Sequence, residues 1–204
     1  MYELRRQKNE VRAEFLEKRR NILPEKREEW DKKITNTFLR SISYRFCDIV
    51  LIYVSTKDEI STYQIIEHSL ANNKIVACPI SNTEDNTLSF KTIKSMEELY
   101  SGTYNILEPP KTNKDFKDLL KENAEELGAK KHPLAVCVIP CLSYDSGGYR
   151  MGYGKGYYDR FLPTFEGTKI GLSYSEFKSD KLPRGKYDIK LDVIITDKGV
   201  TIVK

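Results

Sequence analysis

Long apolar segments are missing from this chain. Among its 204 residues, no apolar run approaches the ~20 residues with which a helix crosses a bilayer. The first residues are rich in charge and predict a helix rather than a signal peptide. Hydrophobic residues make up 39% of the sequence and charged residues 31%, a balance typical of a soluble globular protein. We therefore expect a cytoplasmic protein with no membrane partner.

Cysteine and histidine are too few and too scattered for most metal or covalent chemistry. The chain has four cysteines and two histidines. Cys137 and Cys141 are four residues apart, but no second close pair and no suitable histidine completes a zinc site. His68 lies within a predicted helix and His132 precedes a proline, so neither indicates a general base. We expect reduced thiols, and no covalent enzyme nucleophile is indicated.

Common signatures of nucleotide and nucleic-acid binding are also absent. The chain contains no Gly-Lys-Ser/Thr of a P-loop and no Gly-x-Gly-x-x-Gly opening a βαβ unit. Its net charge of +4 is too small to require nucleic acid, and it has no sustained basic stripe interleaved with aromatic residues. The charge does suit an anionic small molecule. We expect no nucleic-acid partner.

What the chain does have is a glycine-rich stretch at residues 147–159. Five of its eleven glycines fall in these thirteen residues, together with Arg150 and Lys155. An apolar run at 134–140 precedes the stretch, and a short predicted helix at 157–165 follows it. Glycines allow positive φ angles, and N–H groups leading into a helix favour anions. The pattern predicts a loop that wraps polyphosphate, and a flexible surface loop is the alternative.

Periodicity along the rest of the chain predicts alternating helices and strands. Helices are expected over residues 3–20, 25–40 and 62–72, and one within 111–131. Strands are expected over residues 48–55, 74–78, 87–93, 134–140, 169–174, 192–196 and 200–203. This alternation, which ends in a hairpin, predicts one domain over residues 1–204. Its expected fold is an α/β three-layer sandwich with a mostly parallel central sheet.

Carboxylates near predicted strand ends are candidates for a site. Asp58 and Glu59 follow the strand at 48–55, and ligands of open α/β sheets gather at such carboxyl ends. Capping of the next helix is the alternative for Asp58. Asp159 ends the glycine-rich stretch, and Asp192 begins a later predicted strand. Both offer the hard oxygen ligands that Mg²⁺ prefers. A turn-capping role is the alternative for Asp192.

Cations on the first predicted helix are further candidates. Lys8 and Arg12 are one turn apart, so both can point to one side of the helix. The alternative is a solvated face on which nearby glutamates neutralise them. Arg19 and Arg20 lie on the same helix beyond this pair, and changing both to alanine is expected to leave the KM for ATP near normal.

The glycine-rich stretch resembles a known family signature. Residues 148–162 read Gly-Tyr-Arg-Met-Gly-Tyr-Gly-Lys-Gly-Tyr-Tyr-Asp-Arg-Phe-Leu, which is similar to the signature of 5-formyltetrahydrofolate cyclo-ligase, also called methenyltetrahydrofolate synthetase. The resemblance extends over nearly the whole chain. It implies a ligase that uses ATP and Mg²⁺ to convert 5-formyltetrahydrofolate to 5,10-methenyltetrahydrofolate, releasing ADP and phosphate.

The same resemblance implies roles for particular residues, with ATP as co-substrate. We expect a monomer. The catalytic cations would be Arg150 and Lys155. The ATP-binding residues would be Lys8, Arg12, Arg150, Gly152, Gly154, Lys155, Gly156 and Tyr158. The folate-binding residues would be Val54, Glu59, Tyr104, Tyr153 and Tyr157, with Glu59 on the pterin ring. The Mg²⁺ ligands would be Asp159 and Asp192.

Three positions depart from the family pattern. Ile80, Cys141 and Tyr153 stand where members often have a basic residue, a glycine and a second arginine. Two other functions stay open at this point. A sugar-phosphate isomerase or transferase on a related sheet would release no ADP. A nucleotide- or folate-binding relative without turnover would bind its ligands and form no product.

Overall fold

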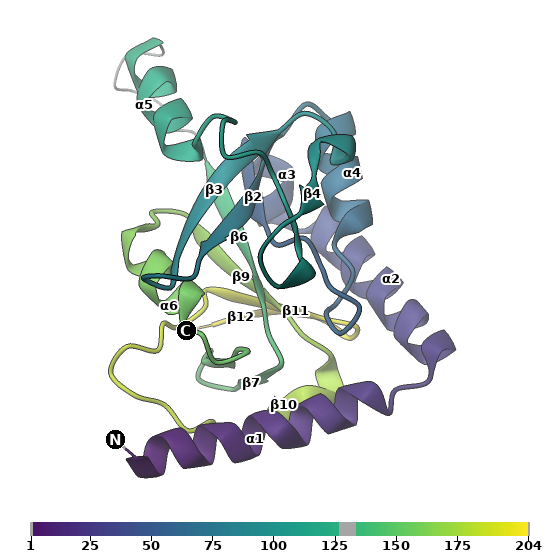
Figure 1. The fold of residues 1–204 in the computed structure, drawn as a ribbon. Coiled ribbons are helices and arrows are strands. Elements are labelled where there is room, and N and C mark those ends of the chain that lie inside the picture. The colour runs from purple at the N-terminus through teal and green to yellow at the C-terminus, as the bar shows by residue number, and fades with distance from the viewer. Residues whose placement is uncertain (1, 127–133, 204) are drawn as a thin grey trace.

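A seven-stranded sheet forms the centre of the molecule (Figure 1). The computed structural model describes residues 2–126 and 134–203. In their order across the sheet, the strands are β12 (Gly199–Ile202), β11 (Val193–Thr196), β9 (Thr168–Leu172), β6 (Ala135–Pro140), β1 (Ile49–Ile52), β2 (Ile75–Asn82) and β3 (Thr87–Ile93). Neighbouring strands from β11 to β2 are parallel, while β3 and β12 form antiparallel edges. The predicted mostly parallel sheet is confirmed.

Both faces of the sheet are buried because its central strands are apolar throughout. All four residues of β1 are fully buried. Successive side chains of a strand point to opposite faces, so Val50 and Ile52 join one core with Trp30, whereas Ile49 and Leu51 join the other. Burial of each such side chain contributes about 1.5–3 kcal/mol. The apolar run at 48–55 thus supplies two cores at once.

Helices cover the two faces and complete the three-layer sandwich. The core of Trp30 is covered by α2 (Pro24–Arg40), α3 (Ile42–Phe46) and α4 (Tyr63–Ala71). The opposite core is covered by α5 (Phe116–Glu126) and α6 (Tyr157–Phe161). The first helix, α1 (Tyr2–Arg20), lies along one edge of the molecule beside β10 (Lys178–Ser179) (Figure 1). Among the described residues, no helix is both long enough and apolar enough to cross a membrane.

The expected long loop between β6 and α6 is partly ordered into a second sheet. Its strands are β7 (Ser143–Asp145) and β8 (Arg150–Met151), which form a hairpin, and β10, which pairs with β7. The Asp145 carboxylate accepts hydrogen bonds from the backbone N–H groups of Tyr149 at 3.0 Å and Leu182 at 3.1 Å. A further hairpin, β4 (Tyr100–Ser101) and β5 (Leu107–Glu108), brackets the turn that carries Tyr104. The glycine-rich region is therefore more regular than the sequence indicates.

Some element boundaries differ from the predictions for identifiable reasons. The second strand continues past Pro79 to Asn82, because β3 pairs with it over that length. The pairing of β1 with β2 ends at Ala77. Beyond Ala77 the strand therefore has a paired neighbour on one side, where the missing N–H of a proline is tolerated. The short α3 was not predicted. His132 and the last part of the predicted 111–131 helix fall outside the described residues.

Candidate active site

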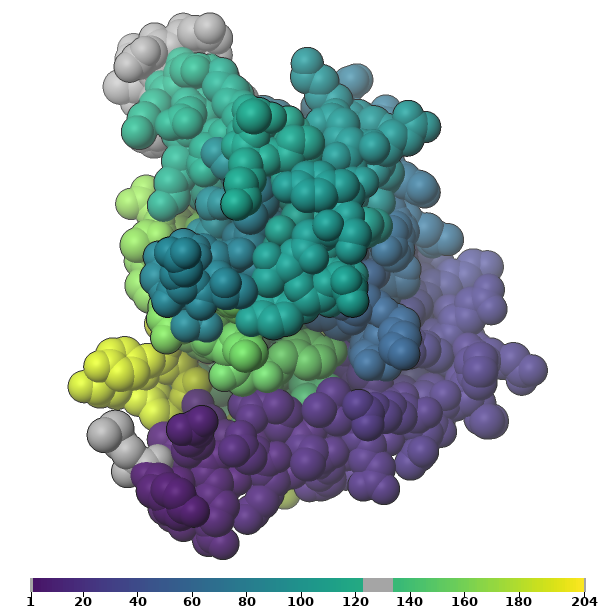
Figure 2. All heavy atoms as spheres, in the orientation of Figure 1, coloured from purple at the N-terminus to yellow at the C-terminus, as the bar shows by residue number. Residues whose placement is uncertain are grey.

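A cavity of about 900 Å³ opens at the carboxyl ends of the parallel strands. The strands β1, β2 and β6 lead into it through Val54, Ser81 and Pro140. The glycine-rich stretch and α1 contribute the facing walls. In the space-filling view, the green surface of that stretch lies between purple α1 and the teal surface of the middle of the chain (Figure 2). Ligands of open α/β sheets bind at such edges, and the volume is that of a small-molecule site.

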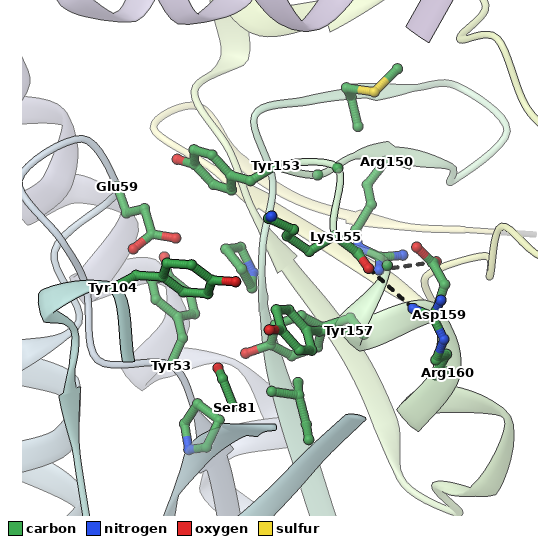
Figure 3. A pocket seen from close by; sticks show the side chains of 18 of the residues that line it. Tyr53, Glu59, Ser81, Tyr104, Arg150, Tyr153, Lys155, Tyr157, Asp159 and Arg160 are labelled. Atoms are coloured by element: carbon green, nitrogen blue, oxygen red, sulfur yellow. Dashed lines mark hydrogen bonds and ion pairs between the residues drawn. The ribbon is translucent and has the colours of Figure 1, made fainter. Parts of the chain in front are cut away.

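The predicted site residues line this cavity, with one exception. Those that line it are Lys8, Arg12, Val54, Glu59, Tyr104, Arg150, Gly152, Tyr153, Gly154, Lys155, Gly156, Tyr157, Tyr158 and Asp159. In the close view, Glu59 lies on one side and Asp159 with Arg150 on the other (Figure 3). Lys155 and Tyr157 lie between them (Figure 3). The exception is Asp192.

The glycine-rich wall takes a path that requires its glycines. After β8 the chain has φ values of 98° at Gly154 and 73° at Gly156, and it then enters α6. Arg12 of α1 donates from Nε to the carbonyl oxygen of Gly152 at 2.9 Å. A Cβ atom on Gly154 would lie 2.9 Å from Arg12 Cζ. The positive φ therefore disfavours a side chain at Gly154, and a Cβ there would also force the Arg12 guanidinium to shift.

The cations of the cavity are partly paired with its own carboxylates. Lys8 Nζ lies 2.6 Å from each carboxylate oxygen of Asp188. Arg150 Nη2 lies 3.1 Å from Asp159 Oδ1, and its side chain is 5% exposed. Lys155 differs, since no carboxylate of the described chain forms a salt bridge with it. Its Nζ lies 5.5 Å from the ring centroid of Tyr104, which leaves its charge available to a ligand.

The structure does not bring Asp192 to Asp159. Asp192 lies just before β11, at the amino-terminal edge of the parallel strands, and its carboxylate accepts from the backbone N–H of Lys169 at 2.7 Å. Asp188 lines the cavity instead. The backbone N–H of Ile189 donates to Asp159 Oδ1 at 3.3 Å, which places the segment carrying Asp188 against Asp159. The carboxylate beside Asp159 in the cavity is therefore Asp188, four residues before the predicted one.

Glu59 is a partly buried carboxylate held by its own loop. Its Oε2 accepts hydrogen bonds from the backbone N–H of Thr56 at 2.9 Å and from the Thr56 hydroxyl at 3.0 Å. Burial raises the pKa of Glu59 above its ordinary value, whereas the Thr56 hydrogen bonds and the charge of Arg19 act to lower it. Neither of these hydrogen bonds uses Oε1. The carboxylate can therefore accept hydrogen bonds from a ligand in the cavity.

Tyrosines supply most of the aromatic surface of the cavity. Tyr104 has a φ of 58°, uncommon for a residue with a side chain, and it is 55% exposed. Tyr153 donates from its hydroxyl to the carbonyl oxygen of Asp58 at 3.4 Å. Tyr158 has a buried hydroxyl with no hydrogen-bond partner in the described chain. These rings offer flat apolar faces and polar tips to a ligand.

Several lining residues were missed by the sequence reasoning. Besides Asp188, they include Glu108, Arg160 and Tyr53. Arg160 follows Asp159 directly, so its place in the signature could have pointed to it. Glu108 reaches the cavity through the β4–β5 hairpin, which the periodicity of the sequence does not predict.

Arg19 belongs to the same charged helix but is buried. It is 3% exposed and contacts loops of the cavity. Its neighbour Arg20 is exposed.

Fold and cavity together define an α/β enzyme whose site has a cationic, glycine-rich wall and a wall with a partly buried carboxylate and tyrosine rings. The sequence model of the 5-formyltetrahydrofolate cyclo-ligase family matches residues 5–197. The chain belongs to this family, and its activity is that of a 5-formyltetrahydrofolate cyclo-ligase, a ligase of folate one-carbon metabolism.

Relatives match over most of the chain. The mitochondrial 5-formyltetrahydrofolate cyclo-ligase of Arabidopsis thaliana is 26% identical over 96% of this chain and 76% of the relative. The enzyme of Escherichia coli K12 is 25% identical over 90% of this chain and 97% of the relative. Among solved structures, Aquifex aeolicus 5,10-methenyltetrahydrofolate synthetase has a TM-score of 0.78 at 28% identity, covering 97% of this chain and 93% of that one. Fold and family therefore agree.

The path of the glycine-rich wall can be tested by stability. We expect Gly154→Ala to lower the free energy of unfolding by roughly 1–3 kcal/mol, because alanine is strained at positive φ and meets Arg12. Gly152→Ala is the matched control, since a Cβ there meets no atom within 4 Å. Urea unfolding of the ligand-free protein measures both. Equal stability of the two variants would contradict the described loop conformation.

Proposed function

We propose that this cavity carries out the ATP-dependent cyclisation of 5-formyltetrahydrofolate to 5,10-methenyltetrahydrofolate. The observation that carries the proposal is the presence of two unlike walls around one cavity. Cations and glycine N–H groups on one wall suit polyphosphate. The partly buried carboxylate of Glu59 and tyrosine rings on the other suit a flat ring that carries N–H donors. Both substrates can therefore lie in contact with each other.

The phosphate wall would be formed by Arg12, Arg150, Lys155 and the backbone of 152–156, with Lys8 at its edge. Lys155 needs no rearrangement to meet a phosphate, because no carboxylate of the described chain pairs with it. Tyr158 lines the cavity beside these groups, and its buried hydroxyl has no hydrogen-bond partner in the described chain.

The reaction needs positioning and charge stabilisation more than a protein nucleophile. The formyl oxygen of the folate attacks the γ-phosphorus, the bond to the bridging oxygen breaks, and ADP leaves with the electron pair. N10 then attacks the activated formyl carbon and loses its proton, and the carbon–oxygen bond breaks to release phosphate. Arg150 and Lys155 would stabilise the charge on the transferring phosphoryl group.

Mg²⁺ fits the phosphate wall when the nucleotide supplies part of its coordination. Among residues 2–126 and 134–203, no cluster of three or more metal-binding side chains occurs. Mg²⁺ usually needs only one or two carboxylates beside phosphate oxygens and water. Asp159 and Asp188 both line the cavity and would supply them. When bound, the ion neutralises phosphate charge.

On the other wall, Glu59 would accept hydrogen bonds from the amino and ring N–H groups of the pterin. Val54 and Tyr104 would contact the ring, and Tyr153 and Tyr157 would lie beside it.

Three wider expectations stay predictions: a single domain over residues 1–204, a monomer and a cytoplasmic location.

The activity itself has a direct test. We expect the purified protein to generate the absorbance of methenyltetrahydrofolate from 5-formyltetrahydrofolate only when ATP and Mg²⁺ are both present, with ADP formed in equal amount. Binding of both substrates without product would instead indicate a relative that has lost turnover.

The choice between Asp188 and Asp192 gives a prediction with a built-in control. We expect Asp159→Asn and Asp188→Asn to raise the Mg²⁺ concentration that gives half-maximal turnover and to lower the maximal rate, because each removes a charged oxygen ligand. Asp192→Asn should leave the Mg²⁺ titration unchanged, since its carboxylate contacts Lys169 outside the cavity. A shift in Asp192→Asn alone would favour the sequence-based assignment.

The role of Glu59 predicts a pH dependence. Because burial raises the pKa of Glu59, folate affinity should fall as the pH is lowered through that raised pKa, where the carboxylate becomes protonated. We expect Glu59→Gln to weaken folate binding by roughly 1–3 kcal/mol, as for a hydrogen bond to a charged group, and to remove this part of the pH profile. Calorimetric titration measures both. An equal loss of ATP affinity would argue against a pterin-specific role.

A further inference from the structure

Arg19 is a buried cation that the proposed mechanism does not use. It lies in the last turn of α1 and is 3% exposed. No salt bridge to it occurs in the described chain. A buried charge is costly unless it is compensated by hydrogen bonds or by an opposite charge. The partners that Arg19 does have therefore indicate what it is for.

Its hydrogen bonds end on three separate segments around the cavity. Nη2 donates to the carbonyl oxygen of Cys141 at 2.9 Å, in the connection after β6. Nη1 donates to the carbonyl oxygen of Asp58 at 3.1 Å, in the loop that carries Glu59. The hydroxyl oxygen of Tyr153 also accepts from Nη1, at 3.4 Å. One planar guanidinium thus joins the Glu59 loop to the glycine-rich wall.

Aromatic rings complete the environment of this guanidinium. Its Cζ lies 5.2 Å from the ring centroid of Tyr174 and 5.4 Å from that of Phe177. Contact with ring faces offsets part of the cost of burying the charge. The Nε atom is nevertheless buried with no hydrogen-bond partner. An apolar side chain would fill the same space without that cost, so packing alone does not account for an arginine.

Helix α2 also holds this loop, through contacts with the residues that follow Asp58. Arg27 donates from Nη2 to the carbonyl oxygen of Glu59 at 2.7 Å. Asp31 accepts from the backbone N–H of Ser61 at 3.1 Å. Charged side chains of two helices thus hold the backbone of 58–61, and Arg19 alone among these three also reaches Cys141 and Tyr153.

We propose that Arg19 is a positioning residue that holds Glu59 and Tyr153 in one geometry and thereby sets the affinity for the folate substrate. The inference rests on the proposed function, because it takes these residues to be the folate wall. Arg19 donates to the backbone carbonyl of Asp58, next to Glu59, and to the hydroxyl of Tyr153, and it is not among the residues that line the cavity. Its effect is therefore on substrate binding and not on the reacting atoms.

The test compares Arg19→Met with Arg20→Met, the exposed neighbour on the same helix. Equilibrium binding of 5-formyltetrahydrofolate and of a non-hydrolysable ATP analogue is measured separately, together with the melting temperature. We expect Arg19→Met to weaken folate binding about ten- to a hundredfold, the scale of losing hydrogen bonds to a charged group. ATP-analogue binding should change by less than about threefold, and Arg20→Met should bind both ligands like the wild type.

Two milder variants keep the test decisive if Arg19→Met does not fold. Arg19→Lys retains the charge but has one nitrogen in place of the fork, so it should lose part of the folate affinity. Arg27→Met removes only the contact to the Glu59 carbonyl and should weaken folate binding less than Arg19→Met.

The outcomes separate this inference from the proposed function. Folate affinity unchanged in Arg19→Met or Arg19→Lys, or lost equally with ATP affinity, would overturn the positioning role and leave the proposed function intact. A wild-type protein that binds no folate would overturn the proposed function and this inference with it.

Discussion

The site depends on arginines of α1 that bind backbone carbonyl groups of the loops around the cavity. Arg12 binds the carbonyl of Gly152, and Arg19 binds those of Asp58 and Cys141. A guanidinium presents five donors in one plane, so a single side chain can join two chain segments. Because these contacts end on the backbone, they constrain the path of each loop whatever side chains it carries. Apolar contacts also hold the helix, with Phe15 buried and Val11 and Leu16 partly buried against the core.

The second constraint is electrostatic. Four charged groups that line the cavity form two partly buried pairs, Lys8 with Asp188 and Arg150 with Asp159. Each pair keeps its charges compensated in a place where an isolated charge would be costly. Lys155 forms no salt bridge within the described chain and lies against the ring of Tyr104. A nucleotide with its metal ion would thus meet both signs of charge already in position, with carboxylates available to the cation and amines and guanidinium groups to the phosphates.

Much of the fold was predictable because local rules and tertiary packing agree there. The run at 48–55 has no alternation, and a strand of that kind is stable only between two covered faces. The glycine-rich stretch was predictable as a binding wall for a similar reason. Positive φ angles at Gly154 and Gly156 are a local property of the backbone, and glycine is the residue that adopts them without strain. Its spacing also carried the family resemblance, which covers residues 5–197.

By itself, then, the sequence determined the alternation of strands and helices, the mostly parallel sheet, the glycine-rich wall and the place of Glu59 after β1. Only the tertiary structure decided which of two nearby carboxylates lines the cavity together with Asp159. Asp188 and Asp192 are four residues apart, but a parallel strand begins just after Asp192, and the two ends of a parallel sheet lie on opposite edges. The tertiary structure also decided that Arg19 is buried, although its neighbours in sequence are charged and exposed. Its acceptors lie 39, 122 and 134 residues away along the chain, and no local pattern reports contacts of that separation.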